Sequence, residues 1–290
     1  MRLPYKLWPD KDVRVDRIRI GRIPALVLRP KDKGYGKAET SGKDLKGAPG
    51  VLWIHGGGYM LGMKEIVFMG RAEALVKKYG AVVLSPGYRL SFRAPFPAAA
   101  DDCYEALLYM KAHAAKLGIR DDQIMVGGES AGGGLAAALC MMARDRGSVR
   151  IAFQMPLYPM IDNFDTESSK DNHGRVWNTK KNRRAWKMYL RKDAGRTVSP
   201  YAAPARQTDH SCLPPAYTFV GEGEPFYCET LAYIKKLQQA GIPAKVDVYP
   251  TDMHAFDMMR PESALGRKAV SRFEEEFRYA VEHYFAPQDD

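Results

Sequence analysis

Apolar and charged residues alternate along the first part of the chain. Over Val13–Ile20 the sequence reads VRVDRIRI, and an extended apolar pattern resumes over Pro24–Leu28. An alternation with a period of two places one face of a strand in the core and the other in solvent. The two segments therefore predict half-buried strands joined as a hairpin. The Gly- and Lys-rich segment Lys31–Pro49 has no periodicity and is predicted to be a surface loop.

Further along the chain, short apolar runs alternate with segments whose apolar residues have helical spacing. The predicted strands are Val51–Ile54, Ala81–Leu84, Gln123–Val126, Ile151–Met155, Ala216–Val220 and Lys245–Tyr249, and the predicted helices are Val67–Tyr79, Asp101–Leu117, Leu135–Arg146, Leu231–Ala240 and Ala264–His283. Strands that alternate with helices form a mostly parallel sheet with helices on its faces. The 290 residues therefore predict an α/β fold, with residues 1–290 in a single domain.

The alternation lapses between Pro159 and Pro200. This part has the character of an insertion, in which residues 162–198 are predicted to form a small helical cap and Asn182–Lys192 a helix. Apolar side chains of that helix, Trp186 among them, either pack on the core or line a substrate pocket, and the sequence fits both interpretations.

Charge is concentrated in the same insertion. The chain carries a net charge of +10, and ten basic residues against two acidic ones lie between Lys170 and Arg196. Because the excess belongs to one segment, it indicates a solvated helix face rather than a nucleic-acid-binding surface. The four cysteines form no CxxC pair, which argues against a zinc or redox site. No apolar run has the length of a signal peptide or a membrane span, so a cytoplasmic protein is expected.

One serine stands in a glycine-rich stretch, GGESAGGG, at 127–134. It follows the predicted strand Gln123–Val126 and precedes the predicted helix Leu135–Arg146. A strand, a tight turn and a helix are the context of a G-x-S-x-G nucleophile elbow, in which a strained backbone exposes Ser130 and the glycines avoid clashes. Phosphate-binding turns also use glycines here, so the stretch alone fits catalysis and anion binding about equally.

A second glycine motif changes this balance. HGGGY at 55–59 directly follows the predicted strand Val51–Ile54 and matches the loop whose amides bind the oxyanion of an acyl-transfer intermediate. Together with YRLSFRAPFPAA at 88–99 and SPYAAP at 199–204, the two motifs resemble the hormone-sensitive-lipase-like family of α/β-hydrolase carboxylesterases. The resemblance extends over nearly the whole chain and implies an α/β-hydrolase fold and a serine esterase.

The resemblance also implies roles for individual residues. Ser130 corresponds to the family's nucleophile, and the backbone amides of Gly57, Gly58 and Ala131 correspond to its oxyanion hole. His254, which begins an HAF sequence after the last predicted strand, corresponds to the family's catalytic histidine.

The acidic member of the triad departs from the family pattern. The family carries an Asp-Pro pair about thirty residues before its histidine, and the matching pair here begins with Glu224. Glutamate can also orient an imidazole, because the fold admits either acid in the order serine, acid, histidine. Glu222, Asp247 and Asp252 are rivals; Asp247 lies within a predicted strand and Asp252 very near His254, which makes both poorer candidates.

The predicted function is hydrolysis of a small-molecule ester through an acyl-enzyme, with no metal or organic cofactor. Tyr59 and Trp186 are predicted to contact the substrate, and the small cap predicts short acyl chains. A catalytically impaired receptor on the same scaffold is the main alternative, because the usual aspartate is replaced, although His254 argues against it. Neither nucleic acid nor a membrane is expected as a partner, and the sequence leaves room for a homo-oligomer.

Overall fold

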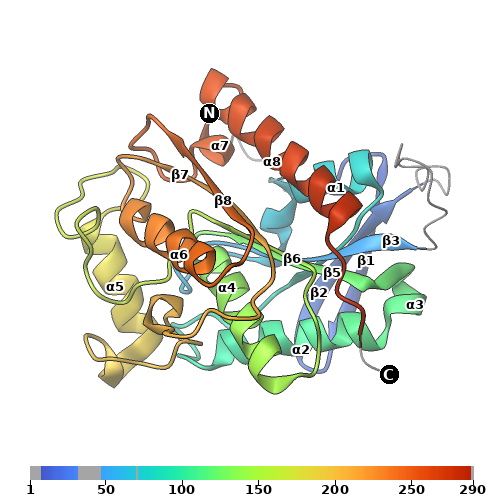
Figure 1. The fold of residues 1–290 in the computed structure, drawn as a ribbon, viewed down its shortest axis with the longest axis horizontal. Helices are drawn as coiled ribbons and strands as arrows, with labels where there is room; N and C mark the ends of the chain where they lie inside the picture. The colour runs from blue at the N-terminus through green and yellow to red at the C-terminus, as the bar shows by residue number, and fades with distance from the viewer. Residues whose placement is uncertain (1–7, 32–46, 70, 289–290) are drawn as a thin grey trace.

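The backbone forms a central sheet with helices on both faces (Figure 1). A computed structural model describes residues 8–31, 47–69 and 71–288 of the chain. In these residues the sheet has eight strands in the order β1-β2-β4-β3-β5-β6-β7-β8. The strands are β1 Val13–Ile20, β2 Ile23–Pro30, β3 Ala48–Ile54, β4 Val82–Pro86, β5 Ile119–Glu129, β6 Phe153–Leu157, β7 Ala216–Gly221 and β8 Ala244–Tyr249. The predicted α/β fold is confirmed.

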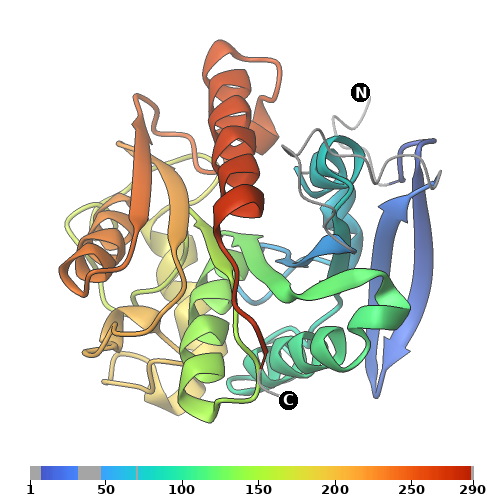
Figure 2. The ribbon, with the colours of Figure 1, turned by 45° about the vertical axis from the view of Figure 1, so that its right-hand side comes forward.

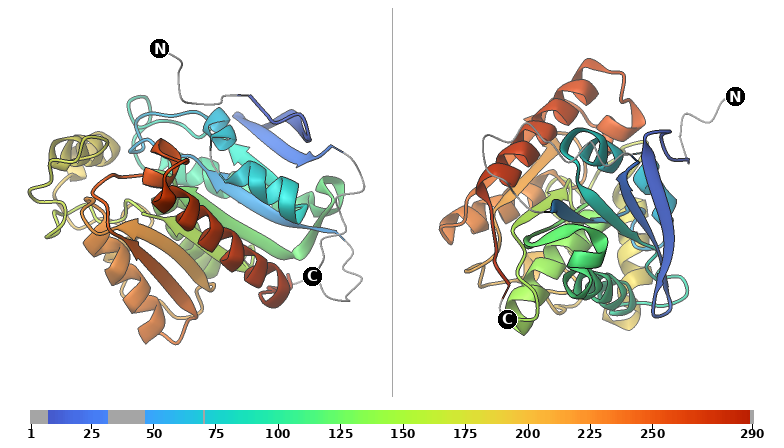
Figure 3. Two further views of the ribbon diagram at one scale, coloured as in Figure 1. Left: turned by 90° about the horizontal axis from the view of Figure 1, so that it is seen from above. Right: turned by 90° about the vertical axis from the view of Figure 1, so that its right-hand side faces the viewer.

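Strand direction brings the motif residues to one edge of the sheet. β1 and β2 form the predicted antiparallel hairpin, which lies at one side of the molecule (Figure 3, right). β2 also pairs antiparallel with β4, whereas all the remaining neighbours are parallel. Parallel strands end at the same edge, so the segments that follow β3, β5, β7 and β8 meet there.

Side chains from each strand alternate between two core layers. Leu52 and Ile54 of β3 point into one layer, and Val51 and Trp53 point into the other. Helices α2, α4 and α6 cover the first layer, and α1 and α8 cover the second (Figure 2). The α-helices are α1 Ala72–Tyr79, α2 Ala98–Ala112, α3 Ala114–Leu117, α4 Ala131–Arg146, α5 Thr179–Leu190, α6 Tyr227–Gln239, α7 Phe256–Met259 and α8 Ala264–His283.

Several element boundaries differ from the prediction. The helix predicted over Val67–Tyr79 is a short 3₁₀ helix, η2 at Lys64–Phe68, followed by α1. α4 begins at Ala131 instead of Leu135, so the three glycines before Leu135 belong to the helix. They lie close to the backbone of neighbouring segments, which leaves no room for larger side chains. The helix predicted over Asp101–Leu117 begins earlier and is divided into α2 and α3.

The segment between β6 and β7 contains α5 and two 3₁₀ helices, η3 Arg191–Asp193 and η4 Pro204–Arg206. α5 begins after Asn178, whose side chain accepts a hydrogen bond from the amide of Lys181 at 3.1 Å. It lies at the opposite end of the molecule from α3 (Figures 1 and 3). Its apolar side chains are buried apart from the half-buried Met188, and its basic side chains are exposed. Most of the predicted loop Lys31–Pro49 lies outside the described residues.

Candidate active site

Ser130 stands at a sharp turn between β5 and α4. Its backbone has φ 57° and ψ −117°, a conformation that residues with side chains rarely adopt. The amide of Ser130 donates to the carbonyl of Leu157 at 3.0 Å, and its carbonyl accepts from the amide of Gly134 at 2.9 Å. A β-carbon at Gly132 would lie 2.0 Å from the carbonyl oxygen of Ile54, so only glycine fits there. This turn has the geometry of a nucleophile elbow.

The structure brings Ser130, His254 and Glu224 together. Nε2 of His254 lies 3.0 Å from Oγ of Ser130, and Nδ1 of His254 makes a short contact with Oε2 of Glu224. The other oxygen of Glu224 accepts from the amide of Gly221 at 2.7 Å. All three side chains are buried. A carboxylate at Nδ1 favours the tautomer in which Nδ1 carries the proton and Nε2 accepts from the serine hydroxyl.

The rival acids take other positions. Glu222 is exposed to solvent. Asp247 accepts a hydrogen bond from the hydroxyl of Tyr217 at 2.8 Å, in the middle of β8. Asp252 packs its α- and β-carbons against Gly223. Among these candidates, Glu224 alone forms a hydrogen bond with His254 in the part of the chain that the structure describes.

The HGGGY loop faces the serine across a cavity. Gly57 has φ 118° and Gly58 has φ 60°, both left-handed values that favour glycine. Within the described residues, no hydrogen-bond acceptor pairs with the amide of Gly57 or Gly58. Ala131, the residue after Ser130, begins α4, so its amide is one of those that a helix N-terminus leaves without an intrahelical partner. The arrangement can therefore supply amide donors to an oxygen atom bound beside Ser130.

The cavity has a volume of about 250 Å³ and a mostly apolar wall. Besides the glycine loop, Ser130 and His254, its wall includes Leu61, Ile66, Met69, Tyr158, Val176, Trp177, Met258 and Met259. Val176 and Trp177 come from the insertion between β6 and β7, so the predicted cap contributes to the wall.

Two residues predicted to contact the substrate do not line this cavity. The hydroxyl of Tyr59 donates to the carbonyl of Met160 at 2.6 Å, and its ring stacks on Tyr189 with centroids 4.1 Å apart. Trp186 packs against Tyr59 with ring centroids 5.4 Å apart. Both side chains join the insertion between β6 and β7 to the core. The tryptophan in the cavity wall is Trp177, which the sequence analysis did not single out.

Aromatic rings surround the buried histidine. Tyr158 and Phe226 approach the ring of His254 edge-on, with centroids 5.1 and 5.0 Å away. Trp177 lies at 6.5 Å. These rings leave the histidine few orientations and keep it pointed between Glu224 and Ser130.

Burial also changes two other ionisable groups near the site. Desolvation lowers the pKa of His55 to about 4, and its Nδ1 lies 2.8 Å from the carbonyl oxygen of Gly56. His55 is therefore neutral near pH 7 and helps to shape the glycine loop. Desolvation raises the pKa of Glu129 to about 7, although the neighbouring Arg71 opposes the shift. Glu129 directly precedes Ser130 and also lines the cavity.

In the described residues, no group of three or more His, Cys, Asp or Glu side chains is arranged to hold a metal ion. No helix there is both long and apolar enough to cross a membrane.

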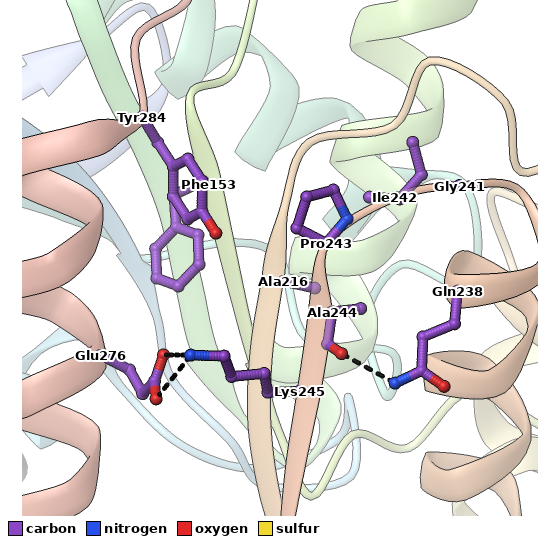
Figure 4. A pocket seen from close by; sticks show the side chains of 10 residues that line it. All are labelled: Phe153, Ala216, Gln238, Gly241, Ile242, Pro243, Ala244, Lys245, Glu276 and Tyr284. Carbon is purple, nitrogen blue, oxygen red and sulfur yellow. Dashed lines mark hydrogen bonds and ion pairs between the residues drawn. The ribbon is translucent and has the colours of Figure 1, made fainter.

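A second pocket of about 430 Å³ lies at the other end of the sheet (Figure 4). Its wall contains the first residues of β6, β7 and β8, and an ion pair between Lys245 and Glu276 crosses one side. It contains no residue of the two glycine motifs.

Known proteins resemble this chain in sequence and fold. The model of the alpha/beta hydrolase fold family matches residues 51–258. Esterase LipI of Mycobacterium tuberculosis is 28% identical over 88% of this chain and 84% of its own. Ethyl acetate hydrolase of Pseudomonas putida is 30% identical over 72% of this chain and 66% of its own. The solved structure of a bacterial heroin esterase has a TM-score of 0.84 and 32% identity, and covers 93% of this chain and 85% of its own.

Several curated relatives are longer than this chain, which spans 62 to 66% of their length.

Proposed function

Because the chain belongs to the alpha/beta hydrolase family, we propose that it is a carboxylic ester hydrolase that uses Ser130 as its nucleophile. The observation that carries the proposal is the 3.0 Å contact between Nε2 of His254 and Oγ of Ser130, at a turn with positive φ. Relatives and solved neighbours named as esterases support the same reaction class.

The reaction begins when Oγ of Ser130 attacks the carbonyl carbon of an ester. His254 takes the serine proton at Nε2, and Glu224 stabilises the imidazolium that forms. His254 then gives the proton to the departing alcohol, which leaves an acyl group on Ser130. Water, activated by the same histidine, hydrolyses this acyl-enzyme and restores the serine.

The amides of Gly57, Gly58 and Ala131 form the oxyanion hole in this proposal. They donate to the carbonyl oxygen as it gains negative charge in the tetrahedral intermediate. The lack of a backbone acceptor for the amides of Gly57 and Gly58 within the described residues supports this role, since both donors remain available to a bound oxygen. A donor of this kind contributes about 10²- to 10³-fold to the rate.

The substrate class follows from the cavity. Its volume of about 250 Å³ is below the range of about 300 to 1,000 Å³ that is usual for drug-sized ligands. The apolar wall favours hydrocarbon over charged groups. We therefore propose short acyl esters as substrates, and the name of the relative ethyl acetate hydrolase agrees with this size. Residues 162–198 act as a small lid, with Val176 and Trp177 on its cavity side.

The test is hydrolysis of p-nitrophenyl acetate, butyrate and palmitate by the wild-type protein and Ser130→Ala. We expect activity on the two short esters, little on palmitate, and loss of about 10⁴-fold or more in the variant. Activity retained by a correctly folded Ser130→Ala would refute the assigned nucleophile. A wild-type protein that binds esters but hydrolyses none would favour a receptor instead.

A further inference from the structure

A buried arginine links the two turns that carry Ser130 and His254. Arg71 directly precedes α1, and its side chain is 2% exposed. Its Nη1 atom lies 3.7 Å from Oε1 of Glu129, the residue before Ser130. Its Nη2 atom contacts a carboxylate oxygen of Asp257, three residues after His254. One guanidinium therefore pairs with both turns.

Packing holds this guanidinium in place. Its central carbon lies 5.3 Å from the ring centre of Phe219 and 5.4 Å from that of Phe273. Oε1 of Glu129 also accepts a hydrogen bond from the indole N–H of Trp53 at 2.8 Å. A planar cation held between rings and carboxylates has little freedom, so movement of either turn disturbs its contacts with the other.

The ionic cluster, which we define as Arg71, Glu129 and Asp257, is not explained by stability alone. Buried ion pairs are often no more stabilising than apolar residues of the same volume, because desolvation opposes their attraction. Within the described residues, Nε and Nη1 of Arg71, Oε2 of Glu129 and both carboxylate oxygens of Asp257 have no hydrogen-bond partner, so the cluster is held by ion-pair contacts. The cluster is therefore a costly arrangement, and its two acidic members lie next to the reactive residues in the sequence, Glu129 directly before Ser130 and Asp257 three residues after His254.

We propose that Arg71 is a positioning residue that holds the Ser130 and His254 turns at their reactive separation by pairing with Glu129 and Asp257 at once. Arg71 does not line the cavity and acts through the two turns. This inference rests on the proposed function, since it assigns a role within the same serine hydrolase site.

Glu129 is the member of the cluster that changes charge near neutral pH. The charged and titratable groups around it are Arg71, Asp257 on α7, Tyr158 after β6 and Tyr88 after β4. Burial raises the pKa of both tyrosines, so they stay neutral. Because the pKa of Glu129 is raised to about 7, its carboxylate is protonated as the pH falls through that value. Arg71 then loses one of its two charged partners.

The experiment compares wild type with Glu129→Gln, in which the amide oxygen can still accept from Trp53. Both kcat and KM for p-nitrophenyl butyrate are measured between about pH 5.5 and 8.5. The concentration of active sites is determined by titrating the reactive serine with an organophosphate, and each rate is divided by that concentration. We expect the ratio of wild-type to variant kcat to be about 10 at the alkaline end and to approach about 1 at the acid end. We expect KM to change by less than about twofold.

A control variant outside the ionic cluster distinguishes loss of positioning from the general effect of removing a buried charge. Asp102, also buried, pairs with Arg89 through contacts of 2.8 Å, and neither residue lines the cavity. Asp102→Asn removes a buried charge in the same way, and its kcat ratio to wild type should not change with pH. Arg71→Lys keeps the charge and should recover part of the activity lost in Arg71→Met.

Each outcome has a separate meaning. A kcat of Glu129→Gln equal to that of wild type at the alkaline end, or the same pH-dependent ratio in Asp102→Asn, overturns the positioning role. If Arg71→Met does not fold, the charge-free triple variant Arg71→Met, Glu129→Gln, Asp257→Asn takes its place, and a wild-type kcat in that variant overturns the proposal too. Activity in Ser130→Ala would instead overturn the proposed function itself.

Discussion

Trp177, in the predicted cap between β6 and β7, packs directly on the backbone of Gly58. A β-carbon built on Gly58 would lie 2.3 Å from Cη2 of Trp177, well inside van der Waals contact. The indole of Trp177 is fixed in turn, because its N–H donates to the side-chain oxygen of Asn182 at 3.3 Å. The cap and the glycine loop are thus packed as one unit, and a change in either should alter the other.

This contact makes Gly58→Ala a sensitive substitution. The new methyl group must displace Trp177, and positive φ at Gly58 adds backbone strain of about 1 kcal/mol. A displaced loop moves the proposed oxyanion donor, so we expect kcat for p-nitrophenyl butyrate to fall by about 10²-fold. Steady-state kinetics of the purified variant give the measurement.

Gly118→Ala is the matched control for that substitution. Gly118 also has positive φ, of 74°, but nothing lies within 4 Å of the position of its β-carbon. We expect a loss of stability of about 1 kcal/mol in urea unfolding and an unchanged kcat. A similar loss of kcat in both variants would mean that backbone strain, not the Trp177 contact, matters.

Glu224 should be required for the correct form of His254. In Glu224→Gln the amide oxygen can still accept from Gly221, but the amide group can no longer balance a charged imidazole. We expect kcat to fall by about 10³- to 10⁴-fold, as loss of the triad acid does in other serine hydrolases. The pH dependence of kcat/KM, compared with wild type, tests the effect on the histidine.

Two further variants define how specific that effect is. Glu224→Asp is too short to span both Gly221 and His254, so an intermediate loss of about 10- to 100-fold is expected. Glu222→Gln changes an exposed acid on the same loop and should have wild-type kinetics. If Glu224→Gln were nearly fully active, another acid would have to serve His254.

Trp177 should limit the length of the acyl chain. Trp177→Leu enlarges the apolar cavity, so kcat/KM for p-nitrophenyl hexanoate relative to acetate should rise on the order of tenfold. Trp186→Leu is the matched control, since Trp186 packs on Tyr59 and lies outside the cavity wall. An equal change of preference in both variants would contradict the assignment of Trp177 to the pocket.

The buried His55 should make the fold sensitive to acid. Because the folded-state pKa is lowered to about 4 from 6.5, the folded protein resists protonation that the unfolded chain accepts. The associated stability is fully present above about pH 6.5 and is lost as the pH falls toward 4, by about 3 kcal/mol. Urea unfolding at several pH values measures this change.

His55→Asn removes the titration and keeps a donor near the carbonyl of Gly56. Its free energy of unfolding should rise relative to wild type as the pH falls. Glu129 has a raised pKa and acts in the opposite sense, so the quantity to compare is the difference between variant and wild type at each pH.

Local patterns predicted the fold and the positions that the structure brings together. The turn at Ser130 and the loop at Gly57 follow directly from a strand, so their glycine motifs are short-range signals. Glu224 and His254 lie just after β7 and β8, which the alternation of strands and helices also predicted. Residues that follow parallel strands meet at one edge whatever the details of packing.

These local patterns did not predict contacts between segments that are distant in the sequence. Trp177 and Trp186 are nine positions apart in one insertion, and only the way the cap folds back decides which of them faces the cavity. Arg71 meets Glu129 and Asp257 from far away in the chain, and no periodicity in the sequence marks that meeting. Tyr59 was predicted to face the substrate, but its hydroxyl is taken by a backbone carbonyl from the loop after β6.

The positive φ of Ser130 also restricts which hydroxyl the turn can carry. A threonine would bring a second heavy atom onto the β-carbon, and branched side chains are strongly disfavoured in this part of conformational space. Cysteine is unbranched and would fit the same backbone. The backbone at this turn therefore selects the nucleophile by the shape of its side chain. Cysteine fits it more easily than threonine, although serine and threonine carry the same reactive group.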